Sequence, residues 1–595
     1  MQASQDITKL LSRLWLHISR RRRRQFGLLV ILMILGSFAE MLSIGAVLPF
    51  LGVLTNPDRV FDHPAARPII QILGLTSADQ LLLPLTMAFG LAALVAGAMR
   101  LLVQWANTRI SFATGADLSI NIYRRTLYQP YAIHIARNSS EVISGILRTT
   151  DIIIYSILMP ILVLIGSSAM LIAIPIALLA IDPVIALTAF AGFGAIYGII
   201  ISLTQHQLAT NSKRISQEST QVLKSLQEGL GGIRDVLIDG SQAAYCQIYR
   251  NADIPLRRAH GNNAFIGAFP RYGIEALALT LIAALAYTIA QQPDGIAKAV
   301  PLLGALAFGA QRLLPVLQQG YSAWSNIEGG RASLQDTLEL LDQPLPEYAN
   351  QAAPEPIPYR QRISLNKLSF RYTPDTPWVL RDLSLIIPKG ARVGFIGATG
   401  SGKSTLLDII MGLLQPTEGN LAIDDQTITP VNHRAWQAHI AHVPQAIYLA
   451  DSTIEENIAF GRPKNQIDSQ RVRQAARQAQ IADVIESWPK QYQTLVGERG
   501  IRLSGGQRQR IGIARALYKQ ADVIIFDEAT SALDNETERA VMDAIEGLGH
   551  DLTILIIAHR LTTLQNCSQI IELGKGGVLR AGNYQDLVGK PALTD

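Results

Sequence analysis

A glycine-rich segment, residues 397–405, carries the clearest chemistry in this chain. Its sequence GATGSGKST matches the pattern G-x-x-x-x-G-K-[ST], in which glycines let backbone N–H groups close around phosphates. The apolar Phe395-Ile396 before it predicts a strand, and a helix is expected from Ser404 onward. We therefore expect a nucleoside triphosphate to be held by Gly397, Thr399, Gly400, Ser401, Gly402, Lys403, Ser404 and Thr405.

An apolar run over residues 523–526 ends in the carboxylate of Asp527. A short, continuous apolar run predicts a buried strand. A carboxylate at the end of such a strand is the form taken by the Mg²⁺-holding aspartate of P-loop enzymes. The hydroxyl of Ser404 is the other expected Mg²⁺ ligand in this pattern.

Residues 503–507 read LSGGQ and form a second candidate phosphate contact. Ser504 offers a hydroxyl, while Gly505 and Gly506 let backbone N–H groups approach an anion at a helix N-terminus. Together with the loop at 397–405, this motif resembles the ATP-binding cassette (ABC) superfamily, whose signature is LSGGQ. The resemblance implies ATP and Mg²⁺ as cofactors, with Ser504, Gly505, Gly506 and Gln507 as the clamp on ATP.

Five further positions match motifs of that superfamily in order along the domain. The resemblance implies that Tyr372 stacks on the adenine and that Gln445 contacts Mg²⁺. It also implies that Glu528 is the general base and that His559 hydrogen-bonds the terminal phosphate, while Asp534 belongs to the D-loop. The implied catalytic residues are therefore Glu528, His559 and Gln445, and the implied metal ligands are Ser404, Gln445 and Asp527.

One chain carries one phosphate loop and one LSGGQ signature. In the family that this chain resembles, the signature of one domain closes on ATP held by the loop of another. Neither motif is degenerate in this sequence, so the resemblance implies a homodimer of two identical chains with two active sites.

The composition separates a membrane half from a soluble half. Of the 595 residues, 49% are hydrophobic and only 17% are charged, and the apolar excess lies in roughly the first 320 residues. We expect a six-span α-helical transmembrane domain over 1–341, a proline-rich linker over 342–358 and an α/β P-loop ATPase domain over 359–595. The predicted spans are residues 26–51, 81–105, 152–180, 184–203, 264–290 and 296–317.

Basic residues orient the chain in the bilayer. Five arginines, residues 20–24, precede the first apolar stretch, and the long segments after the second and fourth spans are also basic. The positive-inside rule places these parts in the cytoplasm, which predicts an inner-membrane, multi-pass protein with both termini and the ATPase domain inside. The same rule makes nucleic-acid binding the weaker explanation of the arginine cluster. By resemblance to the ABC exporter fold, turns near 131–141 and 228–235 should dock on the ATPase domain.

Charged side chains within predicted spans are candidate substrate contacts, because burying a charge in a bilayer is costly. They are Glu40, Arg100, Arg271, Glu275 and Arg312. Arg271 and Glu275 have helical i,i+4 spacing and could form a pair, and Arg100 could snorkel to the interface. The other interpretation is that Arg100, Arg271 and Arg312 bind a pyrophosphate through their guanidinium groups.

The leading functional interpretation is an ATP-driven exporter or flippase for an amphipathic substrate. The membrane half resembles bacterial lipid-linked oligosaccharide flippases of the protein N-glycosylation type, which implies a pyrophosphate-bearing lipid cargo. A multidrug or lipid A type exporter is the alternative within the same family, and an ATP-gated channel or regulator is an alternative of another class. A soluble ABC ATPase is disfavoured by the apolar half.

Overall fold

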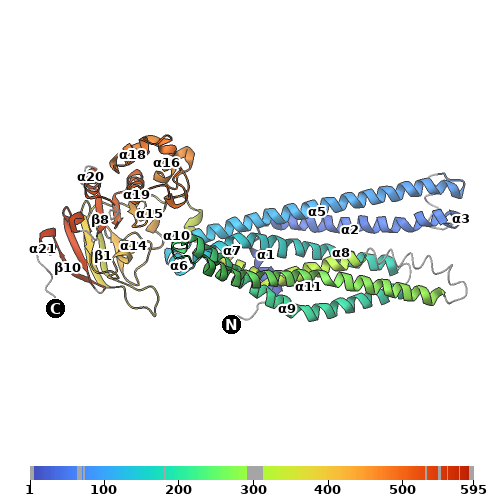
Figure 1. Ribbon diagram of the computed structural model, residues 1–595. Coiled ribbons are helices and arrows are strands. Elements are labelled where there is room, and N and C mark those ends of the chain that lie inside the picture. Colours follow the sequence, from blue (N-terminus) through green and yellow to red (C-terminus); the bar gives the residue numbers. More distant parts are fainter. Residues whose placement is uncertain are drawn as a thin grey trace. The chain divides into compact units, whose positions relative to one another are not determined.

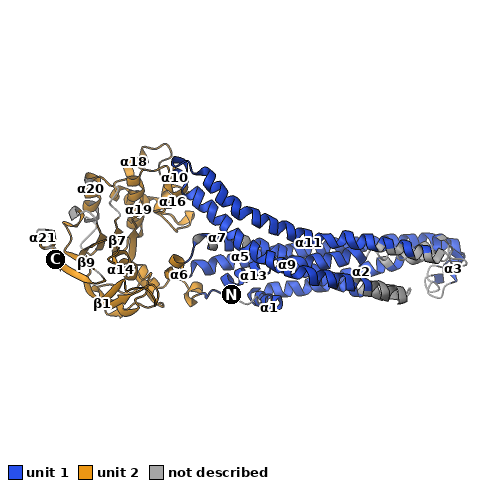
Figure 2. Ribbon diagram, turned by 60° about the horizontal axis from the view of Figure 1, so that its bottom comes forward, with its two compact units in different colours: residues 1–129, 137–345 blue, residues 130–136, 346–595 orange. Residues whose placement is uncertain are grey.

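The computed structural model describes residues 6–55, 57–62, 70–71, 74–179, 183–290, 313–528, 533–546, 551–558, 561–574 and 576–588. Its internal contacts divide the chain into two compact units (Figure 2). The first comprises residues 1–129 and 137–345, and the second comprises residues 130–136 and 346–595. The short segment 130–136 therefore belongs to the unit that contains the phosphate loop.

The first unit consists of helices, several of which are much longer than a bilayer is thick. Helix α5 has 46 residues, which corresponds to about 69 Å at 1.5 Å per residue. A hydrocarbon core is only about 30 Å thick, so the helix extends well beyond it. The described helices are α1(Ile7–His17), α2(Arg20–Thr55), α3(Pro57–Phe61), α5(Leu82–Leu127), α7(Ser139–Ile152), α8(Met159–Leu179), α9(Pro183–Gly231), α10(Ile233–Ile238), α11(Gln242–Ala290), residues 313–329 and α13(Arg331–Leu341), with the 3-10 helix η1(Ala78–Leu81) and the π-helix η2(Ile153–Leu158).

Helices α2 and α5 run side by side in opposite directions, as do α9 and α11 (Figure 1). Three contacts fix the register of α2 against α5. Near one end Arg22 Nε donates to Asp117 Oδ2 at 2.8 Å, and further along a Cβ on Gly36 would lie 3.4 Å from Val103 Cγ2. The third contact is the ion pair between Glu40 and Arg100. The two helices are thus antiparallel with a constant register, so that residue numbers rise along α2 as they fall along α5.

Three described helical stretches are long and apolar enough to cross a membrane, namely Arg20–Ser43, Ala78–Leu127 and Ile153–Ile172. They overlap the first three spans expected from the sequence. The expected spans 184–203 and 264–290 lie in α9 and α11, whereas most of 296–317 lies outside the described residues. The count of six spans therefore stays a prediction.

The second unit contains two sheets. A four-stranded antiparallel sheet has the order β2-β1-β4-β5, and a six-stranded sheet has the order β10-β9-β3-β8-β7-β6. In the larger sheet all pairings are parallel except that of β10 with β9, and β8 is buried at every position, as expected of a strand covered on both faces. The strands are β1(Arg362–Phe370), β2(Leu380–Pro388), β3(Arg392–Ile396), β4(Glu418–Ile423), β5(Gln426–Thr427), β6(Ile440–Val443), β7(Val523–Asp527), β8(Thr553–Ile557), β9(Gln569–Leu573) and β10(Val578–Gly582).

Helices surround these sheets and complete two hydrophobic cores. One core contains Trp436, whose indole Nε1 donates to Ile410 O at 2.7 Å and so holds the end of α14. The other core forms between α19, its neighbouring helices and the larger sheet. The α-helices of this unit are α6(Tyr131–Ala136), α14(Lys403–Ile410), α15(His433–Gln437), α16(Ile454–Ile458), α17(Ser469–Gln478), α18(Ala482–Glu486), α19(Gly505–Lys519), α20(Asn535–Glu546) and α21(Tyr584–Val588); its short 3-10 turns are η3(Glu347–Asn350), η4(Lys464–Gln466), η5(Gln491–Gln493), η6(Glu498–Gly500) and η7(Leu561–Leu564).

Candidate nucleotide site

The phosphate loop and the acidic residues Asp527 and Glu528 lie at the same edge of the larger sheet. Strand β8 lies between β3 and β7, and its residue Ile557 is paired with Phe395 on one side and with Asp527 on the other. Because all three strands are parallel, their carboxyl ends meet at one edge, where ligands of open α/β sheets bind. The sheet thus places the loop after Ile396 and the carboxylate of Glu528 only two strands apart.

The phosphate loop adopts a conformation that requires its glycines. Gly397, Gly400 and Gly402 have φ values of 144°, 83° and 95°, which residues with a Cβ rarely adopt. A Cβ on Gly397 would also lie 2.3 Å from Leu573 O. Lys403 closes the loop, since its Nζ donates to Gly397 O at 2.8 Å and to Ala398 O at 3.0 Å. This local geometry presents the loop backbone and the start of α14 to an anion.

The acidic residues at the end of β7 fit a divalent cation. Burial raises the pKa of Asp527, the neighbouring Glu528 raises it further, and Lys403 opposes both. A cation would stabilise the charged carboxylate in this setting. Ser404, Asp527 and Gln445 would hold Mg²⁺, which supplies positive charge to phosphate oxygens.

The predicted base Glu528 contacts the predicted metal ligand Gln445. Gln445 Nε2 donates to Glu528 Oε2 at 2.6 Å, although the two residues lie 83 positions apart in the chain. Glu528 has a φ of 52°, a left-handed conformation that costs a non-glycine residue about 1–3 kcal/mol and that concentrates at functional sites. The structure therefore places the side-chain amide of Gln445 on the carboxylate of Glu528, the residue that directly follows β7.

Tyr372 lies at the helix that follows the phosphate loop. Its hydroxyl is 3.1 Å from Thr405 Oγ1, and its ring packs edge-on against Phe370 with centroids 5.1 Å apart. The ring itself is half-exposed. Tyr372 and Thr405, two residues expected to bind nucleotide, are therefore brought together.

The signature serine is also the N-cap of α19. Gln507 N donates to Ser504 Oγ at 3.2 Å, and Ser504 N donates to Gln507 Oε1 at 2.8 Å, so that the two residues form a capping box. Gly505 and Gly506 form the first turn of the helix. The motif that we expect to clamp ATP thus also fixes the start of α19.

Two other predicted residues have different outcomes. The carboxylate of Asp534 accepts hydrogen bonds from Thr537 N and Thr537 Oγ1, both at 2.8 Å, at the start of α20. These bonds lower the pKa of Asp534. His559 lies outside the described residues, so its place in the site stays a prediction.

Sequence reasoning missed Asp408 on α14. Burial raises the pKa of this carboxyl to about 6, and Asp527 adds to the shift. The charge of Asp408 also affects Tyr131 of α6. Burial raises the pKa of the Tyr131 hydroxyl most, and Asp408 and Tyr372 raise it further. An acidic residue on the helix that starts at Lys403 was the available signal, but helical spacing alone does not reveal that it faces Asp527.

Of the three arginines expected to bind substrate, the structure describes Arg100 and Arg271. Arg100 pairs with Glu40 across α2 and α5, and Arg271 on α11 is exposed, with no ion pair to Glu275 within the described part of the chain. The register of α2 and α5 places Arg100 level with Glu40. Snorkelling of Arg100 and its role in substrate binding both stay predictions. Arg312 lies outside the described residues.

Comparison with known protein families agrees with both units. Residues 380–531 match the family model described as ABC transporter, and residues 26–291 match the model described as ABC transporter transmembrane region. Among solved structures, a bacterial Atm1-family ABC exporter with ATP bound is similar to this chain, with a TM-score of 0.77 and 25% sequence identity. The similarity covers 96% of this chain and 97% of that one.

Curated relatives are similar over most of their length. An ATP-dependent lipid A-core flippase of Cupriavidus metallidurans is 30% identical over 84% of each chain. The protein of the same name from Methylococcus capsulatus is 28% identical over 92% of this chain and 89% of its own. That from Chromohalobacter salexigens is 32% identical over 67% of this chain and 69% of its own. The chain therefore belongs to the ABC transporter family, as an exporter-type half-transporter of the inner membrane whose ATPase domain uses ATP and Mg²⁺ to drive translocation.

Proposed function

We propose that this chain works as a homodimer that flips an amphipathic glycolipid from the cytoplasmic to the outer leaflet of the membrane. The observation that carries the proposal is the assembled nucleotide site, in which Gln445 contacts Glu528 beside the phosphate loop of a chain that also holds membrane-spanning helices. The names of relatives similar over most of this chain add support for flipping as the form of transport.

The homodimer is supported by the exposure of the two half-sites. Thr399 and Gly400 of the phosphate loop are exposed, and so is Ser504 of the signature. A second chain can therefore approach both motifs. In the proposed assembly the signature of each chain covers the ATP bound to the other, and Glu528 orients the attacking water. We also propose that both termini and the ATPase domain face the cytoplasm, which the arginines at the start of α2 support.

The cargo class has two candidates, both of which carry sugars on a lipid. The sequence alone favoured a lipid-linked oligosaccharide, with a lipid A type cargo as the alternative. The relatives described above carry the name lipid A-core flippase, so they support the alternative better. Both are amphipathic and bear a saccharide headgroup, so the proposed cargo is a glycolipid. Transport of each candidate identifies the lipid carrier.

Arg271 is the described arginine that best suits a phosphate of the cargo. It is exposed and forms no ion pair with Glu275 within the described residues, so its charge is available to an anion. Arg100, by contrast, is already engaged by Glu40. A guanidinium binds phosphate oxygens through two parallel hydrogen bonds, which a shorter side chain cannot replace.

Transport into proteoliposomes tests this function. We expect ATP-dependent movement of either a lipid A-core glycolipid or a polyprenyl-pyrophosphate oligosaccharide, and the two arms identify the carrier. Arg271→Ala should reduce transport about tenfold or more while leaving basal ATP hydrolysis unchanged. Arg257→Ala is the matched control, because Arg257 lies on the same helix but pairs with Asp253.

Three outcomes would change the proposal. Transport of neither glycolipid would refute the cargo class. Equal transport by wild type and Arg271→Ala would remove Arg271 from the cargo contact. ATP-dependent ion flux without lipid movement would favour the ATP-gated channel.

A further inference from the structure

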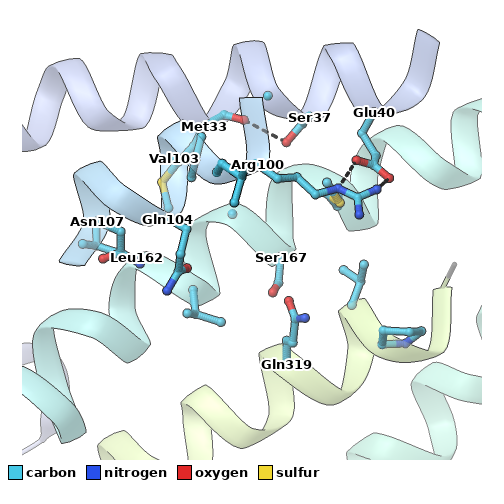
Figure 3. A pocket seen from close by; sticks show the side chains of 17 residues that line it. Met33, Ser37, Glu40, Arg100, Val103, Gln104, Asn107, Leu162, Ser167 and Gln319 are labelled. Atoms are coloured by element: carbon cyan, nitrogen blue, oxygen red, sulfur yellow. Dashed lines mark hydrogen bonds and ion pairs between the residues drawn. The ribbon is translucent and has the colours of Figure 1, made fainter. Parts of the chain in front are cut away.

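A cavity of about 520 Å³, lined by both polar and apolar side chains, lies within the helical unit, between α2, α5, α8 and residues 313–329 (Figure 3). Each helix contributes residues from one face. On α2 these are Met33, Gly36, Ser37 and Glu40, whose spacing is that of successive turns on one side of a helix. The volume is within the usual range for small-molecule sites.

The cavity reaches into the expected spans 26–51 and 81–105, which contain the ion pair of Glu40 with Arg100 in its lining. Polar groups within a membrane span are costly unless they have partners or a function. The lining therefore calls for an explanation beyond packing.

A polar stripe on α5 enters the cavity and continues past it. Arg100, Gln104 and Asn107 line the cavity, and Ser111 and Thr114 follow on the same face. Asn107, Ser111 and Thr114 are almost completely buried, and Ser111 Oγ donates to Asn107 Oδ1 at 3.3 Å. The buried hydroxyl of Thr114 has no hydrogen-bond partner within the described residues. One face of α5 is thus hydrophilic over a stretch in which its other residues are mainly apolar.

The amide groups in the cavity are available to a ligand. Gln104 comes from α5 and Gln319 from the helix over residues 313–329, with Ser167 of α8 close to Gln319 (Figure 3). The structure records no hydrogen bond for either glutamine side chain within the residues it describes. Amides and hydroxyls both donate and accept hydrogen bonds. Gly36 and Gly166 line the cavity without side chains that would fill it.

Among the described residues that line the cavity, one negative and one positive side chain pair with each other. Arg100 Nε donates to Glu40 Oε2 at 2.5 Å, and a second nitrogen of the same guanidinium contacts the other carboxylate oxygen. Such a two-point pair neutralises both groups. An anion at this position would compete with Glu40 for the guanidinium of Arg100. The described lining combines apolar side chains with amides, hydroxyls and one ion pair, and this combination suits a hydroxyl-rich group.

We propose that this cavity binds sugar hydroxyls of the glycolipid headgroup as the headgroup crosses the membrane, with Gln104 and Gln319 as specificity-determining contacts. The inference rests on the proposed flippase function and adds the site at which the saccharide is recognised.

The test compares two lipids that differ only in their sugars, namely lipid A-core and lipid A without the core saccharide. Both are added to the full-length protein in lipid nanodiscs, and stimulation of ATP hydrolysis is measured against lipid concentration. Gln104→Leu and Gln319→Leu should each raise the half-maximal concentration of lipid A-core roughly tenfold, as expected for the loss of one or two hydrogen bonds. The response to lipid A without the core should not change.

Two further variants separate recognition from folding. Gln207→Leu makes the same side-chain change at an exposed position of α9 outside the cavity and should respond as wild type. Ser167→Leu fills the cavity without touching the ion pair and should abolish the preference for lipid A-core. Basal ATP hydrolysis should stay at the wild-type rate in all variants, because none of these residues belongs to the nucleotide site.

An equal effect of the variants on both lipids, or no effect on either, would overturn the proposal. If neither lipid stimulates the wild type, the lipid A cargo fails, and labelling of a Gln319→Cys variant with a maleimide then tests the cavity directly. Cys246→Ser removes the exposed native thiol in that experiment. Protection of Cys at position 319 by a polyprenyl-pyrophosphate oligosaccharide would support the saccharide site, and unprotected labelling would show a cavity that holds water only.

Discussion

Glu528 combines a strained backbone with a short contact to a residue from another loop. Its φ is 52°, and its carboxylate accepts a 2.6 Å hydrogen bond from Gln445 Nε2. A carboxylate held in this way is positioned before nucleotide arrives, which is the condition for an effective general base.

We expect Glu528→Gln to bind ATP normally and to lose ATP hydrolysis by about 100-fold or more, the usual contribution of a positioned base. Binding should survive because the new amide oxygen can still accept the hydrogen bond from Gln445. Nucleotide binding and steady-state hydrolysis are measured side by side. The control is Glu355→Gln, which makes the same change at an exposed residue of the linker. Undiminished turnover in the Glu528 variant would assign the base to another residue.

Asp408 is a residue whose ionisation opposes folding. Burial and Asp527 raise its pKa to about 6 from an ordinary value of 3.8, so the folded state binds the proton more tightly than the unfolded state. Stability therefore falls as pH rises from about 4 to about 6, and the full cost is present at pH 7.

Asp408→Asn should remove this cost. With a discount for the solvent that reaches the half-buried carboxyl, we expect a gain of about 1 kcal/mol at pH 7, or about 2–4 °C in the unfolding midpoint of the ATPase domain. The gain should shrink as pH falls toward 4. Thermal unfolding with EDTA and without nucleotide measures it, and Asp483→Asn on the exposed face of α18 serves as control. A gain that is independent of pH would contradict the assignment.

At the scale of elements, α19 shows how one motif serves structure and function together. Ser504 and Gln507 close a capping box at its start, and the helix then packs its apolar face into the domain core. A cap at this position stabilises the helix and also aims its N-terminal N–H groups outward.

Two substitutions of Ser504 separate these roles. Ser504→Ala should lower the unfolding free energy by about 1 kcal/mol, because it removes the cap. Ser504→Asp should restore the stability, since aspartate caps as well as serine, but should leave ATP hydrolysis impaired because its charge repels phosphate. Unfolding and hydrolysis are measured on the same preparations. Full activity of Ser504→Asp would confine Ser504 to a structural role.

At the scale of the whole molecule, the proposed homodimer predicts which residues of two copies meet. In a chain with Cys246→Ser and Cys567→Ala, one tagged copy carries Thr399→Cys and a differently tagged copy carries Ser504→Cys. Thr399 is chosen because neighbouring Gly400 has a φ of 83°, which a cysteine would adopt only with strain. ATP should promote a crosslinked product that contains both tags.

The crosslinking experiment has an internal comparison. When every chain carries both Thr399→Cys and Ser504→Cys, ATP should promote crosslinks between two chains and none within one chain. Products confined to one chain would contradict the proposed composite site and would require another account of the signature.

The expectations from sequence were strongest where the chemistry is contiguous along the chain. The loop over residues 397–405 needs its glycines, lysine and hydroxyl in fixed order, so its function can be recognised without a fold. The capping box of Ser504 and Gln507 is local as well, because its two partners are three residues apart. Long apolar stretches likewise predicted the helices of the membrane unit.

The sequence by itself determined that this protein binds a nucleoside triphosphate, spans a membrane and carries a phosphate loop and an LSGGQ signature in one chain. Only the tertiary structure decided that Gln445 contacts Glu528, that Asp527 adds to the raised pKa of Asp408, and that Arg100 pairs with Glu40 in the lining of a cavity. The physical reason is that periodicity indicates which face of a helix or strand is buried, whereas the register between elements depends on how their side chains pack. Charges and amides far apart in the chain acquire their partners, and therefore their chemistry, only from that register.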